Sequence, residues 1–275
     1  MSGNDYDPVG GHTKEEADAA YAELFRELHG EEIGGGIDSG DWNGSRDCIG
    51  NEGWNGNGNG GSGAQGADGG RREKVAVIGH RNPDTDCVCS AIAYARLKNE
   101  TDQAREYVPY RLGPVGGEAA YVLERFGAPV PELLEDINAL AEGGDCRKPG
   151  IILVDHNDMA ESVAGAGGAR ILEIIDHHRL ASVETAYPVF FRSQPCGATG
   201  TIVYQLYNEN GAVPDRNAAG LLCAAIISDT MLFRSPTTAH IDRLSAAALA
   251  NLAGLDIEAF AAEMFSSGNG RIGTP

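Results

Sequence analysis

Four short segments of this 275-residue chain place aspartates and histidines directly after an apolar, strand-like stretch. The segments are VAVIGHRNPDTD (75–86), IILVDHND (151–158), ILEIIDHH (171–178) and AAIISDT (224–230). In open α/β sheets the carboxyl ends of the strands line one crevice, and ligands bind there. We therefore expect the polar side chains of these segments to meet at one edge of a sheet. They are His80, Asp84, Asp86, Asp155, His177, His178 and Asp229.

The chemistry of such a cluster is set by its excess of carboxylates and imidazoles over positive partners. Buried acceptors of this kind are stable only around cations. Oxygen and imidazole ligands around a shared carboxylate suit Mn²⁺, Co²⁺ or Mg²⁺ better than a structural Zn²⁺. Two such ions lower the pKa of a bridging water and clamp an in-line displacement at phosphorus. The pattern favours a two-metal hydrolase site.

Each motif taken alone has a simpler interpretation. The segment HRNPDTD (80–86) could be an Asx-rich turn whose aspartates cap the next helix. A single Asp-His pair usually lies in a polar loop, and Asp229 could form a salt bridge with the nearby Arg234. Two Asp-His pairs roughly twenty residues apart, combined with HxxxDxD, are far more specific for metal binding.

Composition limits the classes of function. The formal net charge of -19 argues against a nucleic-acid-binding surface, which is normally basic. It does not exclude an anionic substrate, because bound divalent metals can reverse the local charge. The chain shows no secretory signal, and no apolar run approaches the ~20 residues of a membrane span. Six scattered cysteines then suit a reducing compartment. We expect a cytoplasmic protein without a nucleic-acid or membrane partner.

Alternating strand and helix patterns from residue 73 onward predict an α/β fold with a doubly wound, mainly parallel sheet and helices on both faces. Strands are predicted at 75–79, 107–111, 151–155, 171–175 and 187–192. Helices are predicted at 87–99, 117–127, 159–165, 198–209, 215–228, 238–252 and 256–266. The strand segments ILVD and LEIID are apolar at consecutive positions, which predicts strands that are covered on both sides.

Residues 1–72 are expected to form an N-terminal extension ahead of a metal-binding catalytic domain at 73–267. Thr13 and Glu16 have the spacing of a capping box, and an amphipathic helix is predicted over 13–29. The segment that follows includes GWNGNGNGGSG and has too little apolar surface to offset the entropy of ordering. We therefore predict a Gly-rich flexible segment there.

Together the motifs resemble the DHH phosphoesterase superfamily and, within it, the family II (manganese-dependent) inorganic pyrophosphatases. The matching text is GHRNPDTDCVCSAIAYA, RLG at 111–113, LVDHND, IIDHH, CGATGTIVYQLY and AAIISDTMLFRSPT. The resemblance implies hydrolysis of inorganic pyrophosphate to two phosphates by a hydroxide that bridges two divalent metals. It implies Mn²⁺ or Co²⁺ as the two resident ions, with Mg²⁺ accompanying the substrate. The alternatives are a phosphodiesterase acting on short nucleotides and a split metal-binding domain that needs a partner chain.

The resemblance also implies roles for individual residues. One metal would be held by His80, Asp84 and Asp155, and the other by Asp86, Asp155, His177 and Asp229. His178 would contact the substrate or protonate the leaving phosphate, and His156 and Asn157 would orient the ligands. Candidate substrate contacts are Arg81, Arg111 and Arg192. Cys87 stands where the family usually has serine; a zinc-ligand role is open to it, although one Cys-x-Cys is not the usual zinc spacing.

Family II pyrophosphatases have a second, C-terminal domain whose lysine and Ser-Arg-Lys-Lys residues grip the phosphates. No such run occurs in this sequence. We therefore expect residues 268–275 to begin an interdomain linker, the phosphate-gripping domain to be absent, and hydrolysis to be impaired. The expected partners are a second copy of the chain in a homodimer, or the missing C-terminal domain.

Overall fold

The computed structural model describes residues 72–141 and 148–269. Their centre is a six-stranded sheet in which every pairing is parallel, with the strand order β3-β2-β1-β4-β5-β6. The strands are β1 (Glu73–Ile78), β2 (Arg105–Arg111), β3 (Glu132–Leu133), β4 (Gly150–Val154), β5 (Arg170–Asp176) and β6 (Phe190–Ser193).

The strand order identifies where a ligand should bind. From β1 the chain builds outward through β2 to β3, then returns to the other side of β1 and continues through β4, β5 and β6. The order therefore reverses between β1 and β4, which pair from Val75↔Gly150 to Ile78↔Leu153. In doubly wound sheets this switch point opens the crevice that holds the ligand. The residues that follow β1 and β4 lie at that crevice.

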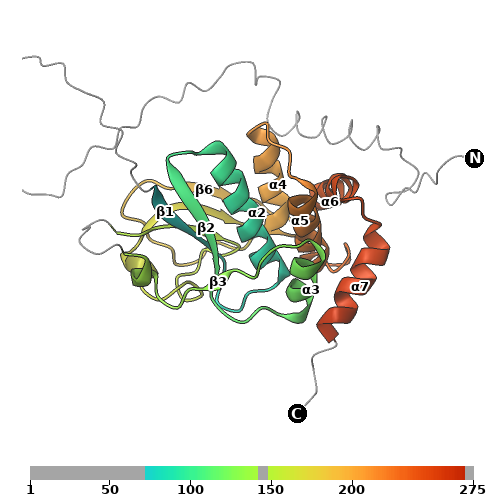
Figure 1. The fold of residues 1–275 in the computed structure, drawn as a ribbon, viewed down its shortest axis with the longest axis horizontal. Coiled ribbons are helices and arrows are strands. Elements are labelled where there is room, and N and C mark those ends of the chain that lie inside the picture. Colours follow the sequence, from blue (N-terminus) through green and yellow to red (C-terminus); the bar gives the residue numbers. More distant parts are fainter. Residues whose placement is uncertain (1–71, 142–147, 270–275) are drawn as a thin grey trace, which may run out of the picture.

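Helical elements lie on both faces of the sheet, as predicted, but the α-helices of the described ranges pack on one face and the 3-10 helices on the other. The α-helices are α2 (Thr85–Thr101), α3 (Gly117–Arg125), α4 (Thr199–Glu209), α5 (Arg216–Asp229), α6 (His240–Ala253) and α7 (Ile257–Asn269). They share one apolar core with Val77 and Ile152, on one side of the sheet (Figure 1). The opposite face, which includes Ile78 and Ile151, packs against loops and two 3-10 helices, η1 (Ile137–Leu140) and η2 (Ala166–Gly168).

Burial of the central strand follows from this arrangement. All five residues of β4 are buried, because alternate side chains enter the two cores. This agrees with the expectation from its consecutive apolar residues. No single helix in the described ranges is long and apolar enough to cross a membrane; α6 and α7 meet that criterion only jointly, bent by 92°.

The predicted strands, and all the predicted helices of the described ranges but one, overlap the observed elements. The exception is the helix predicted at 159–165, which is wrong. The backbone N–H of Arg81 donates to the Glu161 carbonyl, and Arg81 Nε donates to the Ser162 carbonyl. These two carbonyls are therefore not available for the hydrogen bonds of a helix. Gly165, with φ 80°, then turns the chain into η2. The predicted helix at 13–29 and the Gly-rich segment lie outside the described ranges.

Candidate metal centre

Asp155 lies at the centre of the predicted cluster. It follows β4 directly, adopts a left-handed φ of 64°, and its N–H donates to the Ile175 carbonyl at 2.8 Å. Its fully buried carboxylate faces imidazoles on two sides. Oδ2 lies 3.5 Å from His80 Nε2, whereas Oδ1 lies 3.4 Å from His177 Nε2 and 3.7 Å from His178 Nδ1. The two oxygens of one carboxylate therefore face different histidines.

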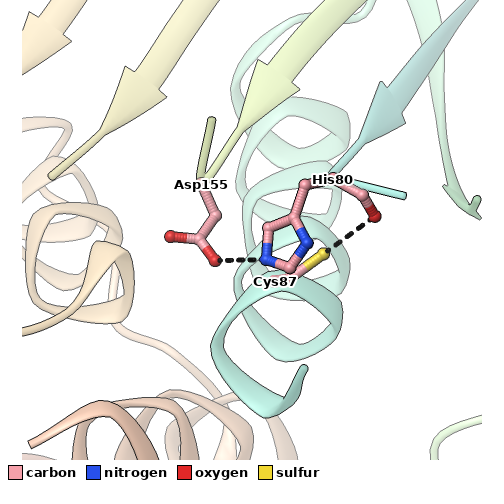
Figure 2. A group of neighbouring side chains, drawn as sticks. All are labelled: His80, Cys87 and Asp155. Carbon is pink, nitrogen blue, oxygen red and sulfur yellow. Dashed lines mark hydrogen bonds and ion pairs between the residues drawn. The ribbon is translucent and has the colours of Figure 1, made fainter. Parts of the chain in front are cut away.

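On one side of Asp155 stands a group formed at the ends of β1 and β4 and the start of α2. Donor atoms of His80, Cys87 and Asp155 all lie within 4.8 Å of one another (Figure 2). Asp84 is close too, with Oδ2 at 3.6 Å from His80 Nε2. Its other oxygen accepts the Cys87 N–H at 2.9 Å and caps α2. Asp84 thus serves as the helix cap and also faces His80.

On the other side, donor atoms of Asp86, His177 and Asp229 lie within 4.8 Å of one another. His177 Nδ1 lies 3.0 Å from the Cys196 carbonyl, and a proton on Nδ1 would leave Nε2 free as a ligand. His177 Nε2 lies 3.4 Å from Asp229 Oδ2. Among the described residues, Asp229 therefore pairs with His177 and not with Arg234.

Asp86 is fixed by the beginning of α4. Its fully buried carboxylate accepts the N–H groups of Thr199 (2.6 Å) and Gly200 (2.9 Å), together with the Ser90 hydroxyl (2.7 Å). The first N–H groups of a helix lack partners within it and favour a negative charge. The Thr199 hydroxyl also donates to Asp155 Oδ1 at 2.9 Å. Sequence reasoning assigned no role to Thr199, because only the fold brings it to these carboxylates.

His178 is held by Asp176, the first residue of the second Asp-His pair. Its Nδ1 lies 2.8 Å from Asp176 Oδ1, and its side chain is half exposed. This hydrogen bond is the main cause that raises the pKa of His178. Asp176 is fully buried and also accepts from Asn157 Nδ2. The sequence pattern contained Asp176, but its anchoring role was not predicted.

The imidazoles of the cluster hold protons strongly in the metal-free chain. Burial opposes this most, yet the neighbouring carboxylates of Asp155 and Asp84 raise the pKa of His80 to about 10. For His177 burial is likewise outweighed, by Asp229 first, and the pKa is about 10. Burial, followed by the charge of Asp155, raises the pKa of Asp229 itself to about 6. In the absence of metal, these raised pKa values favour protonation, which offsets part of the negative charge of the carboxylates.

The residues of this cluster fit divalent metal ions. Asp155 Oδ2 and His177 Nε2 are buried and have no hydrogen-bond partner among the described residues. A buried polar atom without a partner costs about 1–3 kcal/mol, which a cation on each side of Asp155 would remove. Carboxylate oxygens with imidazole nitrogens are a donor set that suits Mn²⁺. These residues could therefore hold the ions that the motifs predict.

The predicted residues around the cluster differ in their hydrogen-bond partners. His156 is buried, with Nδ1 3.1 Å from the Val154 carbonyl and Nε2 without a partner. Arg81 Nε donates to the Ser162 carbonyl, and Arg111 donates to the carbonyls of Pro131 and Gly113. Within the described ranges, neither guanidinium forms a hydrogen bond or ion pair with a member of the cluster.

The guanidinium of Arg192 is held by α4, although the backbone of Arg192 pairs with Ile175 of β5, two residues before His177. It donates to Gln205 and Glu209, each at 3.0 Å, and Glu209 is the last residue of α4. Asp86 contacts the first residue of the same helix. At 1.5 Å per residue, these helix positions are about 15 Å apart. The structure therefore does not bring the Arg192 guanidinium to the predicted ligands.

A strained turn follows Asp229. Met231, Leu232 and Phe233 all have left-handed φ values between 50° and 63°. Each such residue costs about 1–2 kcal/mol. The turn is held by Thr230, which is fully buried and whose carbonyl accepts the N–H groups of Arg234 and Ser235 at 2.8 Å. Strain of this kind persists where the surroundings fix it, often at functional sites.

The chain is similar in sequence to known proteins. Residues 74–226 match the model of the DHH family, N-terminal domain. A "Probable manganese-dependent inorganic pyrophosphatase" of Clostridium acetobutylicum is 46% identical over 194 residues, covering 70% of this chain and 59% of that protein. A protein of Bacillus licheniformis with the same name is 46% identical over 195 residues, covering 71% and 60%.

Solved structures agree with these sequence matches. A Methanococcus jannaschii protein assigned to the family II inorganic pyrophosphatases is 35% identical, with a TM-score of 0.62 over 70% of this chain and 61% of that chain. An exopolyphosphatase-related protein from Bacteroides fragilis, at 17% identity and a TM-score of 0.54, shows the fold alone. The chain spans 59–60% of the length of the two curated relatives named above.

Proposed function

The chain belongs to the DHH family, and on that premise we propose that it forms the metal-binding half of a manganese-dependent inorganic pyrophosphatase. The proposed reaction is hydrolysis of inorganic pyrophosphate to two phosphates. The names of the relatives support it, as does a cluster of carboxylates and imidazoles at the switch point of the sheet. Residues 73–267 would constitute the metal-binding domain.

One observation carries the proposal: the Asp155 carboxylate stands between His80 and His177, with a different oxygen toward each. A carboxylate so placed suits two cations rather than one. His80 and Asp84 would complete the ligands on one side, and Asp86, His177 and Asp229 those on the other. Two divalent ions held there would activate water and offset the charge on phosphate.

The remaining side chains would orient the ligands and move a proton. Asp86 is held by the first N–H groups of α4, so its position does not depend on a flexible loop. His178 Nδ1 is taken by Asp176, which leaves Nε2 of this half-exposed ring free for a substrate oxygen. We assign His178 the proton that the leaving phosphate needs, since imidazole is well suited to acid–base work near neutral pH.

A reducing compartment such as the cytoplasm is the proposed location. The four cysteines in the described ranges are buried and free. Unpaired thiols persist where glutathione and thioredoxin keep them reduced.

The test compares Mn²⁺ binding and phosphate release for the wild-type chain and Asp155→Asn. Asn tolerates the left-handed backbone of this position, so the variant removes the charge with little strain. We expect Mn²⁺ affinity to fall at least about tenfold, the lower end of what ligand-orienting groups alone contribute. Release of phosphate from pyrophosphate should fall with it.

Asp158→Asn is the matched control, because Asp158 is three residues away, solvent-accessible and hydrogen-bonded to Ala160 and Ser182. It should leave both measurements unchanged. Equal Mn²⁺ affinity in wild type and Asp155→Asn would overturn the metal assignment. Hydrolysis of a short dinucleotide without hydrolysis of pyrophosphate would overturn the substrate instead.

A further inference from the structure

Cys87 lies in the first turn of α2, beside the site that His80 and Asp155 form. Its Sγ, a His80 nitrogen and an Asp155 oxygen lie within 4.8 Å of one another. Figure 2 shows the Asp155 carboxylate and the Cys87 sulfur on opposite sides of the His80 ring, with the thiol donating to the His80 carbonyl oxygen at 3.9 Å. Donors that share one ion, at about 2.0–2.3 Å each, lie at most about 4.6 Å apart. Side-chain rotations that release the thiol from the His80 carbonyl would therefore bring all three onto one cation.

Two backbone features place this thiol. Asp84 caps α2 and accepts the Cys87 N–H, so the first helical turn is fixed against the end of β1. Gly79 follows that strand directly, and a Cβ built there would lie 2.0 Å from Cys87 Sγ. The missing side chain at position 79 leaves the room that the sulfur fills. The thiol is only 2% exposed and is not a surface cysteine.

A second observation points to a ligand at this place. Asp155 Oδ2, which belongs to the same group and faces His80, is fully buried and has no hydrogen-bond partner among the described residues. The carboxylate expected from the sequence on this side, Asp84, is half exposed and uses one oxygen for the helix cap. The most buried donors around His80 are therefore one carboxylate and one thiol.

We propose that Cys87 is a thiolate ligand of the cation at His80 and Asp155, and that this position prefers a thiophilic divalent ion such as Zn²⁺ or Co²⁺. The inference rests on the metal centre of the proposed function but not on its substrate. On binding, the S–H bond breaks, the proton leaves to solvent and a sulfur–metal bond forms, without oxidation or reduction. Thiolate ligands shift selectivity toward Zn²⁺, whereas carboxylate ligands suit Mn²⁺.

The other side of Asp155 provides an internal contrast. Asp86, His177 and Asp229 offer oxygen and nitrogen donors and no thiol. The two sides should therefore differ in the ion that they prefer. Cys89 supplies the matched control, because it is fully buried in the same helix but belongs to the apolar core.

The experiment titrates the metal-free 275-residue chain with Co²⁺ and records its absorption spectrum. Visible d–d bands report Co²⁺ in a protein site, and a near-ultraviolet thiolate-to-cobalt charge-transfer band reports sulfur ligation. Wild type and Cys89→Ser should show both signals, while Cys87→Ser should keep the d–d bands and lose the charge-transfer band. Competition should show the preference for Zn²⁺ over Mn²⁺ falling at least about tenfold in Cys87→Ser.

Each other outcome has a distinct meaning. Bound Co²⁺ without a charge-transfer band in the wild type, or a band that survives in Cys87→Ser, would overturn the thiolate ligand alone. Absence of every cobalt band would overturn the metal centre, and with it this inference. Circular dichroism checks that each variant is folded. Cys87→Ser should still bind Mn²⁺ at Asp86, His177 and Asp229, which checks that the substitution has not disrupted the whole metal centre.

Discussion

The hydroxyl of Thr199 donates a hydrogen bond to Asp155 Oδ1 at 2.9 Å, although 44 residues separate the two in sequence. The backbone N–H of the same threonine donates to Asp86 at 2.6 Å. One residue at the start of α4 therefore positions two carboxylates that come from the ends of different elements. Because both are proposed metal ligands, Thr199 should control metal affinity without binding metal itself.

Thr199→Val tests this role, since valine keeps the shape and the N–H but removes the hydroxyl. We expect Mn²⁺ affinity to fall about 10–100-fold, as for other losses of groups that orient ligands. Thr199→Ser keeps the hydroxyl and should bind like wild type. Calorimetry of the three proteins provides the measurement. An unchanged affinity in Thr199→Val would show that Asp155 is positioned by other contacts.

The metal-free chain should lose stability as pH rises. His80 and His177 have pKa values of about 10, above the ordinary 6.5. A histidine whose pKa rises on folding contributes stability fully below about pH 6.5, and the contribution disappears as pH rises through about 10. Asp229 acts in the same direction but at lower pH, because its pKa is raised only to about 6. Denaturant unfolding in chelator should therefore show a falling free energy of unfolding across this window.

Mn²⁺ affinity should change with pH in the opposite direction. The imidazoles of His80 and His177 must lose their protons before they bind a cation, so affinity rises with pH and binding releases protons. Calorimetry in two buffers of different ionisation enthalpy counts those protons. Binding that released none at about pH 7 would contradict the ligand assignment, since both groups are protonated there in the metal-free chain.

Asp176→Asn should alter His178 while leaving the metal ligands in place. The hydrogen bond that the His178 ring donates to Asp176 is the main cause of the raised pKa of His178, so without it the pKa should move back toward 6.5. An NMR titration of the His178 ring measures this directly. If His178 is the proton donor of the reaction, the alkaline limb of the activity profile should shift to lower pH by the same amount. An unchanged pKa of His178 in Asp176→Asn would show that Asp176 does not control the protonation of His178.

Gly220→Ala should destabilise the helical core. A Cβ at position 220 would lie 2.2 Å from the Phe126 ring, which also packs edge-on against Phe260. Overpacking of this kind costs about 1–3 kcal/mol. Gly167→Ala is the control, because a Cβ there meets no atom within 4 Å. Thermal unfolding should distinguish them, while Mn²⁺ binding by the folded Gly220→Ala chain remains that of wild type.

The sequence pattern within each segment was sufficient to predict most helices and strands, because the spacing of apolar residues along one segment indicates its secondary structure. The apolar run at 151–154 predicts a strand buried on both sides, and β4 is one. The segment 159–165 shows the limit: its composition favours a helix, but Arg81, far away in sequence, takes the carbonyls of Glu161 and Ser162. β3 was not predicted, since its two residues are too few to give a periodic pattern.

The sequence alone determined which residue types would meet, since strand ends of one parallel sheet share an edge whatever the packing detail. Tertiary structure decided how those residues are used. It placed Asp155 between two imidazoles and Thr199 against two carboxylates, and it put Cys87 beside His80. It also left Arg192 beside Glu209. The physical reason is that hydrogen bonds and burial depend on distances between elements, which residue spacing along one strand or helix does not contain.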